Sequence, residues 1–227
     1  NLRPPVVKDS SVLRKVLLAT EKLQKEVKDE VPIIGTVMSP FSLPVMQLGF
    51  EKYLDLMHFH KDLFQKLMVV NEEFCIDWAN AQLAAGATAI GYFDPVSSLT
   101  IITREQYLET GFKIAKNTIS RIKGPTATHF ASGRSLGILN DVAQTGTAVV
   151  GISTSEDIVL LKAACKDKLT LLGNLNGVEM RRWSTDEADL IVKQVIQKAA
   201  AGGGFILSDN HGEIPFQVPE NVLIAIS

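Results

Sequence analysis

The chain alternates short apolar runs with longer segments in which apolar residues recur every three or four positions. The short runs have the length and composition of buried strands, and they cover residues 31–37, 89–93, 126–131, 147–152, 169–173 and 205–207. The longer segments predict helices over about 11–29, 61–85, 135–145 and 155–165. Two more helices are predicted after the capping-box pairs of Thr103 with Gln106 and of Ser184 with Glu187. Strands that alternate with helices indicate a parallel sheet with right-handed crossovers.

Polar residues collect where the predicted strands end. In chain order they are Ser39, Asp94, His129, Ser153, Asn174 and the run Ser208, Asp209, Asn210, His211. The carboxyl ends of parallel strands meet at one edge of a sheet, which is where α/β proteins place their chemistry. We therefore expect one α/β domain over residues 1–227, forming about six βα units of a (βα)8 TIM barrel whose first two units are lacking. An open doubly wound sheet is the alternative.

Three further features of the sequence have local interpretations. The proline-containing segment 39–49, SPFSLPVMQLG, predicts an apolar loop that either covers a pocket or only packs. His58 and His60 diverge at helical spacing, so we expect them on the solvated surface. The three glycines 202–204 precede a strand, so they indicate a helix end and a turn rather than a phosphate-binding loop.

Composition limits the class of protein. The chain has 227 residues, 46% of them hydrophobic and 21% charged, as in a soluble globular domain. Its formal net charge of -2 offers no basic surface for nucleic acid. No apolar run approaches the roughly 20 residues of a membrane span. Two cysteines are too few for a disulfide framework. We expect a cytoplasmic protein that binds neither nucleic acid nor membrane.

Two histidines are candidate metal ligands because both stand at strand ends of one predicted rim. They are His129 and His211. A catalytic zinc ion normally takes three protein ligands, so Asp94, Asp209 or Glu213 would have to supply the third. The cysteines fall on predicted helices and are not expected at the rim. A serine hydrolase is not favoured, since Ser132 and Ser153 lack the spacing of a nucleophile elbow.

Several segments resemble the uroporphyrinogen decarboxylase superfamily. GNLNGVEMRRWSTDEADLIVKQVI is similar to its GNLDP segment and following helix, and SDNHGEIPFQVPENV is similar to its LGHGxxPxxxPENV signature. MSPFSLP, AAGATAIGYFDPVSS and AQTGTAVVGIS resemble its SPFTL, AGAD…FDS and AETGADVVGLD segments, in the same order. The resemblance covers nearly the whole chain and implies a (βα)8 barrel with its pocket at the carboxyl rim. It also implies a chain truncated at its N-terminus, where the family keeps its substrate-binding arginines and a key aspartate.

The superfamily contains decarboxylases, which remove acetate carboxylates from a tetrapyrrole without a cofactor, and corrinoid-linked methyltransferases with a cobalamin protein as partner. Asp94 in FDPVSS is closer to the DPxAS segment of the methyltransferases. His211 matches the histidine of LGHG and stands where those methyltransferases have a distant zinc-binding cysteine. His129 in THFASG resembles the histidine of their HxCG motif, with Ala131 in place of the cysteine.

The resemblance thus implies a methyltransferase that moves a methyl group between a small molecule and a corrinoid protein, with zinc held by His129 and His211. It implies catalytic roles for Asp94 and His211, and substrate contacts from Phe41, Met46, Arg134, Ser153, Asn174 and Asn210. Tetrapyrrole decarboxylation, which needs no metal or cofactor, is one alternative. Two replacements count against decarboxylation, Met46 for a tyrosine and Asn176 for an aspartate. A substrate with many carboxylates also needs cationic partners, and Arg134 is the one arginine in a predicted rim loop. A barrel that binds a ligand without turnover is the other alternative.

Overall fold

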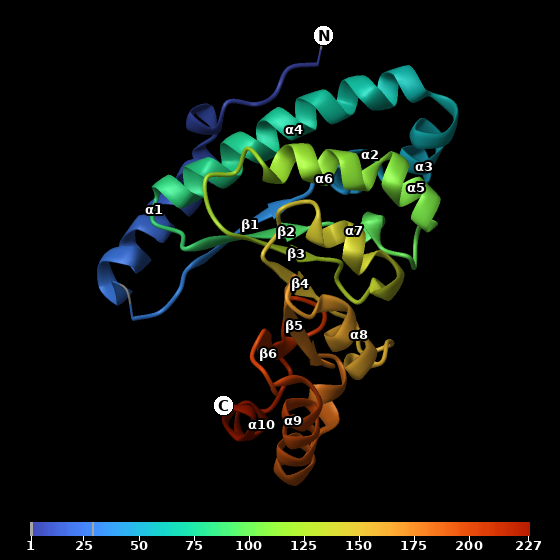
Figure 1. Ribbon diagram of the computed structural model, residues 1–227. Coiled ribbons are helices and arrows are strands. Elements are labelled where there is room, and N and C mark those ends of the chain that lie inside the picture. The colour runs from blue at the N-terminus through green and yellow to red at the C-terminus, as the bar shows by residue number, and fades with distance from the viewer. Residues whose placement is uncertain (1, 29) are drawn as a thin grey trace.

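A computed structural model describes residues 2–28 and 30–227. At its centre lies one sheet of six parallel strands in the order β1-β2-β3-β4-β5-β6 (Figure 1). The strands are β1 (Ile34–Met38), β2 (Ala89–Phe93), β3 (Thr126–His129), β4 (Val149–Gly151), β5 (Thr170–Leu175) and β6 (Phe205–Asp209). The predicted parallel sheet, with its strands in chain order, is confirmed.

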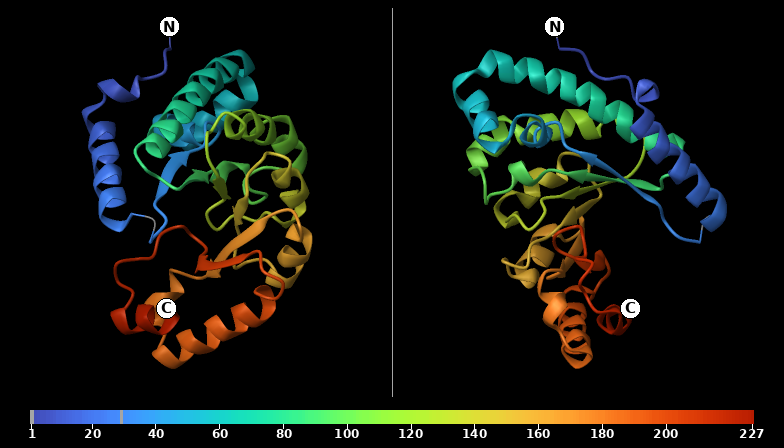
Figure 2. Two further views of the ribbon diagram at one scale, coloured as in Figure 1. Left: turned by 60° about the vertical axis from the view of Figure 1, so that its left-hand side comes forward. Right: turned by 180° about the vertical axis from the view of Figure 1, so that it is seen from behind.

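Helices pack around the outside of this curved sheet, and β1 and β6 form the two ends of the arc (Figure 2). The α-helices are α1 (Ser11–Val27), α2 (Leu43–Leu48), α3 (Phe50–Phe59), α4 (Lys61–Ala84), α5 (Arg104–Glu109), α6 (Gly111–Ile119), α7 (Leu139–Ala143), α8 (Ile158–Cys165), α9 (Thr185–Ala199) and α10 (Glu220–Ile226). Short 3-10 turns are η1 (Val7–Asp9), η2 (Pro95–Ser97), η3 (Leu136–Ile138) and η4 (Glu179–Arg182). Across residues 2–28 and 30–227, none of the helices is both long and apolar enough to cross a bilayer. The six-stranded sheet and its surrounding helices form a partly closed barrel of the TIM type.

Alternation along the strands separates an outer core from an inner face. On β2, Ile90 and Tyr92 point outward and pack with Cys75 and Trp78 of α4 in a buried cluster. Phe93, the next residue along, turns inward to the side on which His129 lies. The outer core continues under α7 and α8, where buried aliphatic residues of β4 and β5 pack. Polar side chains on the inner face are therefore the ones available for chemistry.

Several predicted boundaries were wrong, two of them for a local reason that the structure shows. The segment 39–49 contains helix α2. Pro44 lies in the first turn of this helix, where backbone N–H groups have no partner within the helix, so the missing N–H of proline costs no hydrogen bond. The single helix predicted after the first capping box is broken at Thr110 into α5 and α6. The helix predicted from residue 155 begins at Ile158, since the Asp157 side chain caps it by accepting the Val159 N–H.

The outer edge of β1 is occupied by a side chain of α4. The Thr36 N–H and C=O point away from β2. The Gln82 Oε1 atom accepts from the Thr36 N–H, and the Gln82 Nε2 atom donates to the Thr36 carbonyl, each at 3.0 Å. Gln82 is almost fully buried. Its amide group thus satisfies the two backbone groups that a neighbouring strand would otherwise satisfy.

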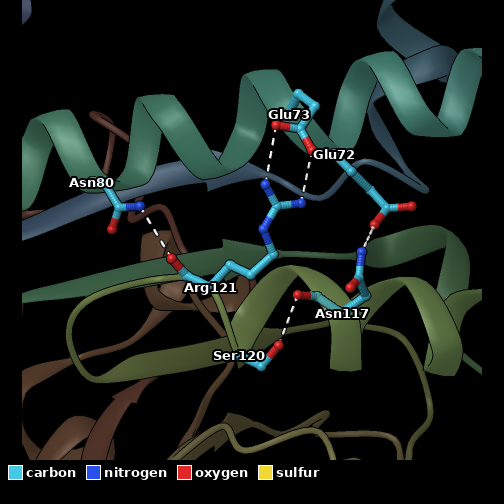
Figure 3. Close-up of polar contacts among 6 residues, drawn as sticks. All are labelled: Glu72, Glu73, Asn80, Asn117, Ser120 and Arg121. Atoms are coloured by element: carbon cyan, nitrogen blue, oxygen red, sulfur yellow. Dashed lines mark hydrogen bonds and ion pairs between the residues drawn. The ribbon is translucent and has the colours of Figure 1, made fainter.

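Helices α4 and α6 are joined on the outside by polar contacts near the C-terminal end of α6 (Figure 3). The Arg121 guanidinium donates to both carboxylate oxygens of Glu73, at 2.7 and 3.0 Å. The Asn80 amide donates to the Arg121 carbonyl (3.1 Å) and accepts from the Lys123 N–H (2.8 Å), and Asn117 donates to Glu72. These contacts fix the β2–β3 crossover that carries His129 to the rim.

Candidate active site

The carboxyl ends of the strands form one continuous rim. Strand register aligns Met38 with Phe93, Phe93 with His129, His129 with Gly151, and Gly151 with Leu172. The ladder extends past the strands, because the Ser39 N–H donates to the Phe93 carbonyl and the Asp94 N–H to the His129 carbonyl. Residues that follow successive strands are thereby held side by side.

His129, the last residue of β3, lies flat against Phe93 on the inner face. The two ring centroids are 4.7 Å apart with an interplanar angle of 14°. Gly151 of β4 leaves room for the imidazole, since a Cβ at that position would come within 2.3 Å of the His129 Cδ2 atom. The Ala131 N–H donates to His129 Nδ1 at 3.0 Å. Burial lowers the pKa of His129, and His211 lowers it further against the opposing effect of Asp209, so the ring is neutral at neutral pH.

The loop after β6 crosses the rim toward Phe93 and is folded by its own aspartate. Asp209 Oδ2 accepts the backbone N–H groups of His211 (2.7 Å) and Gly212 (2.8 Å). Gly212 has a φ of +85°, and a Cβ there would lie 2.4 Å from the Phe93 Cζ atom. Within the described residues, the buried Nδ1 atom of His211 has no hydrogen-bond partner. The loop thus brings a second imidazole to the rim, and the Nδ1 atom of that ring is buried without a partner among the described residues.

Hydroxyl and amide groups line the rim between β3 and β6. Ser153 Oγ donates to the Ser132 carbonyl at 2.8 Å, and the Asn174 amide donates to the Ser153 carbonyl at 3.2 Å. Asn210 donates from its side-chain amide to Thr154 Oγ1 at 3.1 Å. Ser153 and Asn174 are therefore joined by a hydrogen bond, and Asn210 bonds to Thr154, the residue next to Ser153, as expected for residues at neighbouring strand ends.

Asp94 is placed differently from its prediction as a catalytic residue. Its Oδ1 atom accepts hydrogen bonds from the hydroxyls of Ser39 (2.6 Å) and Ser42 (2.7 Å), and all three side chains are buried. Burial, assisted by the Asp94 charge, raises the pKa of Tyr53 and of Tyr107, which belong to the helical layer. The carboxylate thus faces the helices rather than the inner face, and it holds the β1–α2 turn against the β2–η2 turn.

The same burial raises the pKa of Asp94, and hydrogen bonds from serine hydroxyls offset only part of that effect. No charged partner is needed to explain the position of Asp94, since Ser42 also caps the next turn by accepting the Val96 N–H at 3.1 Å. A structural role accounts for both hydroxyl contacts.

The remaining predicted contacts lie at different depths. Phe41 is fully buried and packs edge-on against Tyr53 and Phe64, so its ring cannot touch a substrate in this arrangement. Met46 is 72% exposed on α2. Arg134 is exposed in the β3–η3 loop, where its guanidinium donates to the Leu99 carbonyl at 3.3 Å.

Arg134 does not stand alone among arginines on the rim side, as the sequence had suggested. The β5–α9 connection contains η4, which carries Arg181 and Arg182. Arg182 pairs with Glu179 at 3.5 Å. Arg181 donates to the Val178 carbonyl at 2.9 Å. These two side chains are thus engaged locally within their own turn.

The site residues present do not fit a zinc ion. Since the Ala131 N–H occupies His129 Nδ1, the neutral ring carries its proton on Nε2 and has no lone pair left for a metal. Among the residues that the structure describes, no three His, Cys, Asp or Glu side chains are grouped closely enough to hold a metal ion. Cys75 and Cys165 are buried, and burial raises the pKa of Cys75 to about 12. The predicted zinc binding by His129 and His211 is therefore not supported by the arrangement of these side chains, no chemical step is assigned to it, and metal analysis is its test.

Two features escaped the sequence analysis. Phe93 reads as an ordinary strand residue, and only the strand register brings its ring to His129. The pattern GRSLG at 133–137 has the spacing of a nucleophile elbow and was overlooked. Its serine, Ser135, is fully buried, and the Glu156 carboxylate caps the turn by accepting the Ser135 N–H at 2.7 Å, so Ser135 does not present an accessible nucleophile.

A parallel αβ barrel whose polar side chains converge at the carboxyl rim is the arrangement of a TIM-barrel enzyme. The sequence model of the uroporphyrinogen decarboxylase (URO-D) family matches residues 1–227. The chain belongs to this family.

Relatives with two different activities are similar to the chain. The uroporphyrinogen decarboxylase of Actinobacillus pleuropneumoniae is 27% identical over 237 residues, covering 98% of this chain and 66% of that protein. The methylcobamide:CoM methyltransferase MtaA of Methanosarcina barkeri is 26% identical over 211 residues, covering 91% and 60%. The chain therefore spans about two thirds of the length of the curated relatives it matches.

Solved structures share the fold. A methyltransferase from Methanosarcina mazei superposes with a TM-score of 0.84 at 20% identity, covering 99% of this chain and 68% of its own. A B12-independent methionine synthase from a Shewanella species superposes with a TM-score of 0.66 at 15% identity, covering 92% and 64%. Both support the partly closed TIM-type barrel.

Proposed function

We infer that the protein transfers a methyl group between a corrinoid carried by a partner protein and a small thiol. The observation that carries this proposal is the pair of imidazoles at the mouth of the barrel, His129 and His211, with His211 Nδ1 unpartnered within the described residues. A neutral imidazole with an available nitrogen can accept the proton of a thiol.

The charges around His129 agree better with a thiol than with a tetrapyrrole that bears many carboxylates. Those that act on its ring are the Asp209 carboxylate and the His211 imidazole. An unpaired carboxylate that leaves water costs several kcal/mol unless a cation receives it. A polyanionic substrate would be repelled by Asp209, whereas a thiol carries no charge until its proton leaves.

The chemical step that follows is a nucleophilic substitution. His211 Nδ1 accepts the thiol proton, and the sulfur attacks the methyl carbon of the methylated corrinoid. The carbon–cobalt bond breaks with both electrons on cobalt, which gives a thioether and a Co(I) corrinoid. Phe93 and Gly212 hold the rim in place during this step, because their contact fixes the β6 loop over His129.

Methyl transfer can be tested with methylcobalamin in place of the partner protein. The protein, methylcobalamin and a thiol are mixed anaerobically, and loss of the methylcobalamin spectrum is followed together with thioether formation. We expect transfer that His211→Ala abolishes and Asn140→Ala, an exposed change on α7, leaves intact. Metal analysis of protein purified without chelator tests the predicted zinc in the same preparation.

Decarboxylation is the second candidate, favoured by the position of His211 at the histidine of the LGHG signature and by the 27% identical decarboxylase. Uroporphyrinogen is incubated with the protein and the products are separated after oxidation. Stepwise loss of carboxylates, with no methyl transfer to any thiol, would replace the methyltransferase proposal.

A further inference from the structure

Asn210 presents an unused hydrogen-bond acceptor beside the reacting groups. The residue is 1% exposed, and its Oδ1 atom has no partner within the described residues. A buried carbonyl oxygen without a donor is unfavourable, so a position of this kind usually has a partner when the protein works. The partner must bring an N–H or O–H group.

The Asn210 side chain is buried and fixed in place at the end of β6. The Asn210 N–H donates to the Leu175 carbonyl at 2.8 Å, which extends the β5–β6 ladder by one residue past Asp209. Its amide nitrogen donates to Thr154 Oγ1, so Oδ1 is the end left over. His211, with its own unpartnered Nδ1, is the next residue. Two buried polar atoms without a partner among the described residues therefore stand together at the end of β6.

The LGHG signature that this segment resembles has no side-chain acceptor at the position of Asn210. In the alignment with the LGHG signature, Asn210 stands at the first glycine and Asp209 at the leucine. A glycine offers no side-chain acceptor. The Asp209 carboxylate, in turn, folds the loop that carries both buried polar atoms, through its bonds to the His211 and Gly212 N–H groups.

We propose that Asn210 determines substrate specificity by accepting a hydrogen bond from the substrate, so that the site takes a small thiol whose tail carries a hydroxyl or an ammonium group. This inference rests on the proposed methyl transfer for the identity of the reacting atom. The proposed role of Asn210 concerns the non-reacting end of the substrate, and binding of that end can be measured without any reaction.

The binding experiment uses thioethers of the form CH3–S–CH2–CH2–X, which cannot react. X is a hydroxyl, an ammonium, a methyl or a carboxylate group, so the four compounds differ in donor capacity and charge at one point. We expect the hydroxyl and ammonium compounds to bind about tenfold more tightly than the methyl compound, as a single added hydrogen bond allows. The carboxylate compound, which offers no donor at neutral pH, binds most weakly.

Three variants identify the residue responsible. Asn210→Gly restores the residue of the family signature and is expected to remove the tenfold preference while leaving binding of the methyl compound unchanged. Asn210→Asp keeps an acceptor, so it is expected to retain the hydroxyl compound and to favour the ammonium compound further. Asn140→Ala, an exposed asparagine on α7, is the control and changes nothing.

Equal binding of all four compounds, binding of none, or a preference that survives in Asn210→Gly overturns the proposal. Tightest binding of the carboxylate compound, lost in Asn210→Asp, also overturns it, since the amide would then be acting as a donor. These outcomes are independent of turnover. Donor-dependent binding without methyl transfer to the matching thiols would refute the proposed function and leave the role of Asn210 standing.

Discussion

Replacing Asp94 separates its structural role from the catalytic one that the sequence suggested. Asp94→Ala leaves the Ser39 and Ser42 hydroxyls, which now donate at 2.6 and 2.7 Å, without an acceptor in a buried space. Each buried group left unpaired costs about 1–3 kcal/mol. We therefore expect the free energy of unfolding to fall by about 3–5 kcal/mol, once the lost packing of the side chain is included.

Asp94→Asn should behave differently because the amide keeps an oxygen for the serines and carries no charge. The pKa of Asp94 is raised, which means that folding favours the protonated carboxyl over the ionised one. The neutral amide resembles that favoured form. At pH 7 we expect the asparagine variant to be at least as stable as the wild type and to keep its activity.

The pH dependence gives the sign of the effect. Below about pH 4, Asp94 is protonated in both the folded and the unfolded chain and adds no pH dependence. As the pH rises from there to the raised folded pKa, the folded chain binds more protons than the unfolded chain, so stability is lost by up to about 1.4 kcal/mol per pH unit. Above that pKa the loss is complete and constant. Asp94→Asn lacks this loss.

Denaturant titrations followed by circular dichroism from pH 4 to pH 8 provide the measurement, with wild type and both variants side by side. A loss of more than about 2 kcal/mol in Asp94→Asn at pH 7 would refute the reasoning from burial. An asparagine variant that folds as well as the wild type and loses methyl transfer would instead restore the catalytic role predicted from the sequence.

Two other predictions concern the inner face. Since the pKa of His129 is lowered in the folded chain, the stability that this residue gives is present above about pH 6.5 and is lost as the pH falls through the folded pKa. The variant His129→Asn can still accept the Ala131 N–H, so it should flatten the plot of stability against pH below pH 6.5. An unchanged plot would contradict this prediction. In denaturant titrations, Gly212→Ala should lower the free energy of unfolding by about 1–3 kcal/mol more than Gly202→Ala does. Both glycines have positive φ (+85° and +77°), but a Cβ at Gly212 would meet Phe93, whereas nothing lies within 4 Å of a Cβ at Gly202. Equal losses would show that Phe93 moves aside for the added methyl group.

Local sequence signals were sufficient for the elements that depend on local physics. The strand at Ala89–Phe93 was predicted to the residue, and both capping boxes are present at Thr103 and Ser184. Each is set by residues within a few positions of one another. Segment 39–49 failed because Pro44 was interpreted as a loop signal, although proline equally suits the first turn of a helix.

Placement of the site depended on information that the local sequence does not contain. His129, Ser153, Asn174 and His211 lie at or just beyond the carboxyl ends of successive strands, so parallel topology alone predicts their convergence on one rim. The side of the sheet that Asp94 faces could not be predicted, because alternation along a strand stops where the turn begins and the serines then decide the orientation. The stacking of Phe93 on His129 likewise depends on register between β2 and β3.

The Gln82 amide at the outer edge of β1 has a consequence for self-association. Strand edges with open N–H and C=O groups recruit other chains, and proteins commonly protect them with charges, prolines or covering elements. Here the Gln82 side-chain amide of α4 protects the edge by taking the place of a peptide group from a neighbouring strand at Thr36. Any strand that adds to this edge must first displace a buried amide and leave it without partners. The edge is thereby guarded against indiscriminate pairing, even though its backbone remains extended and regular.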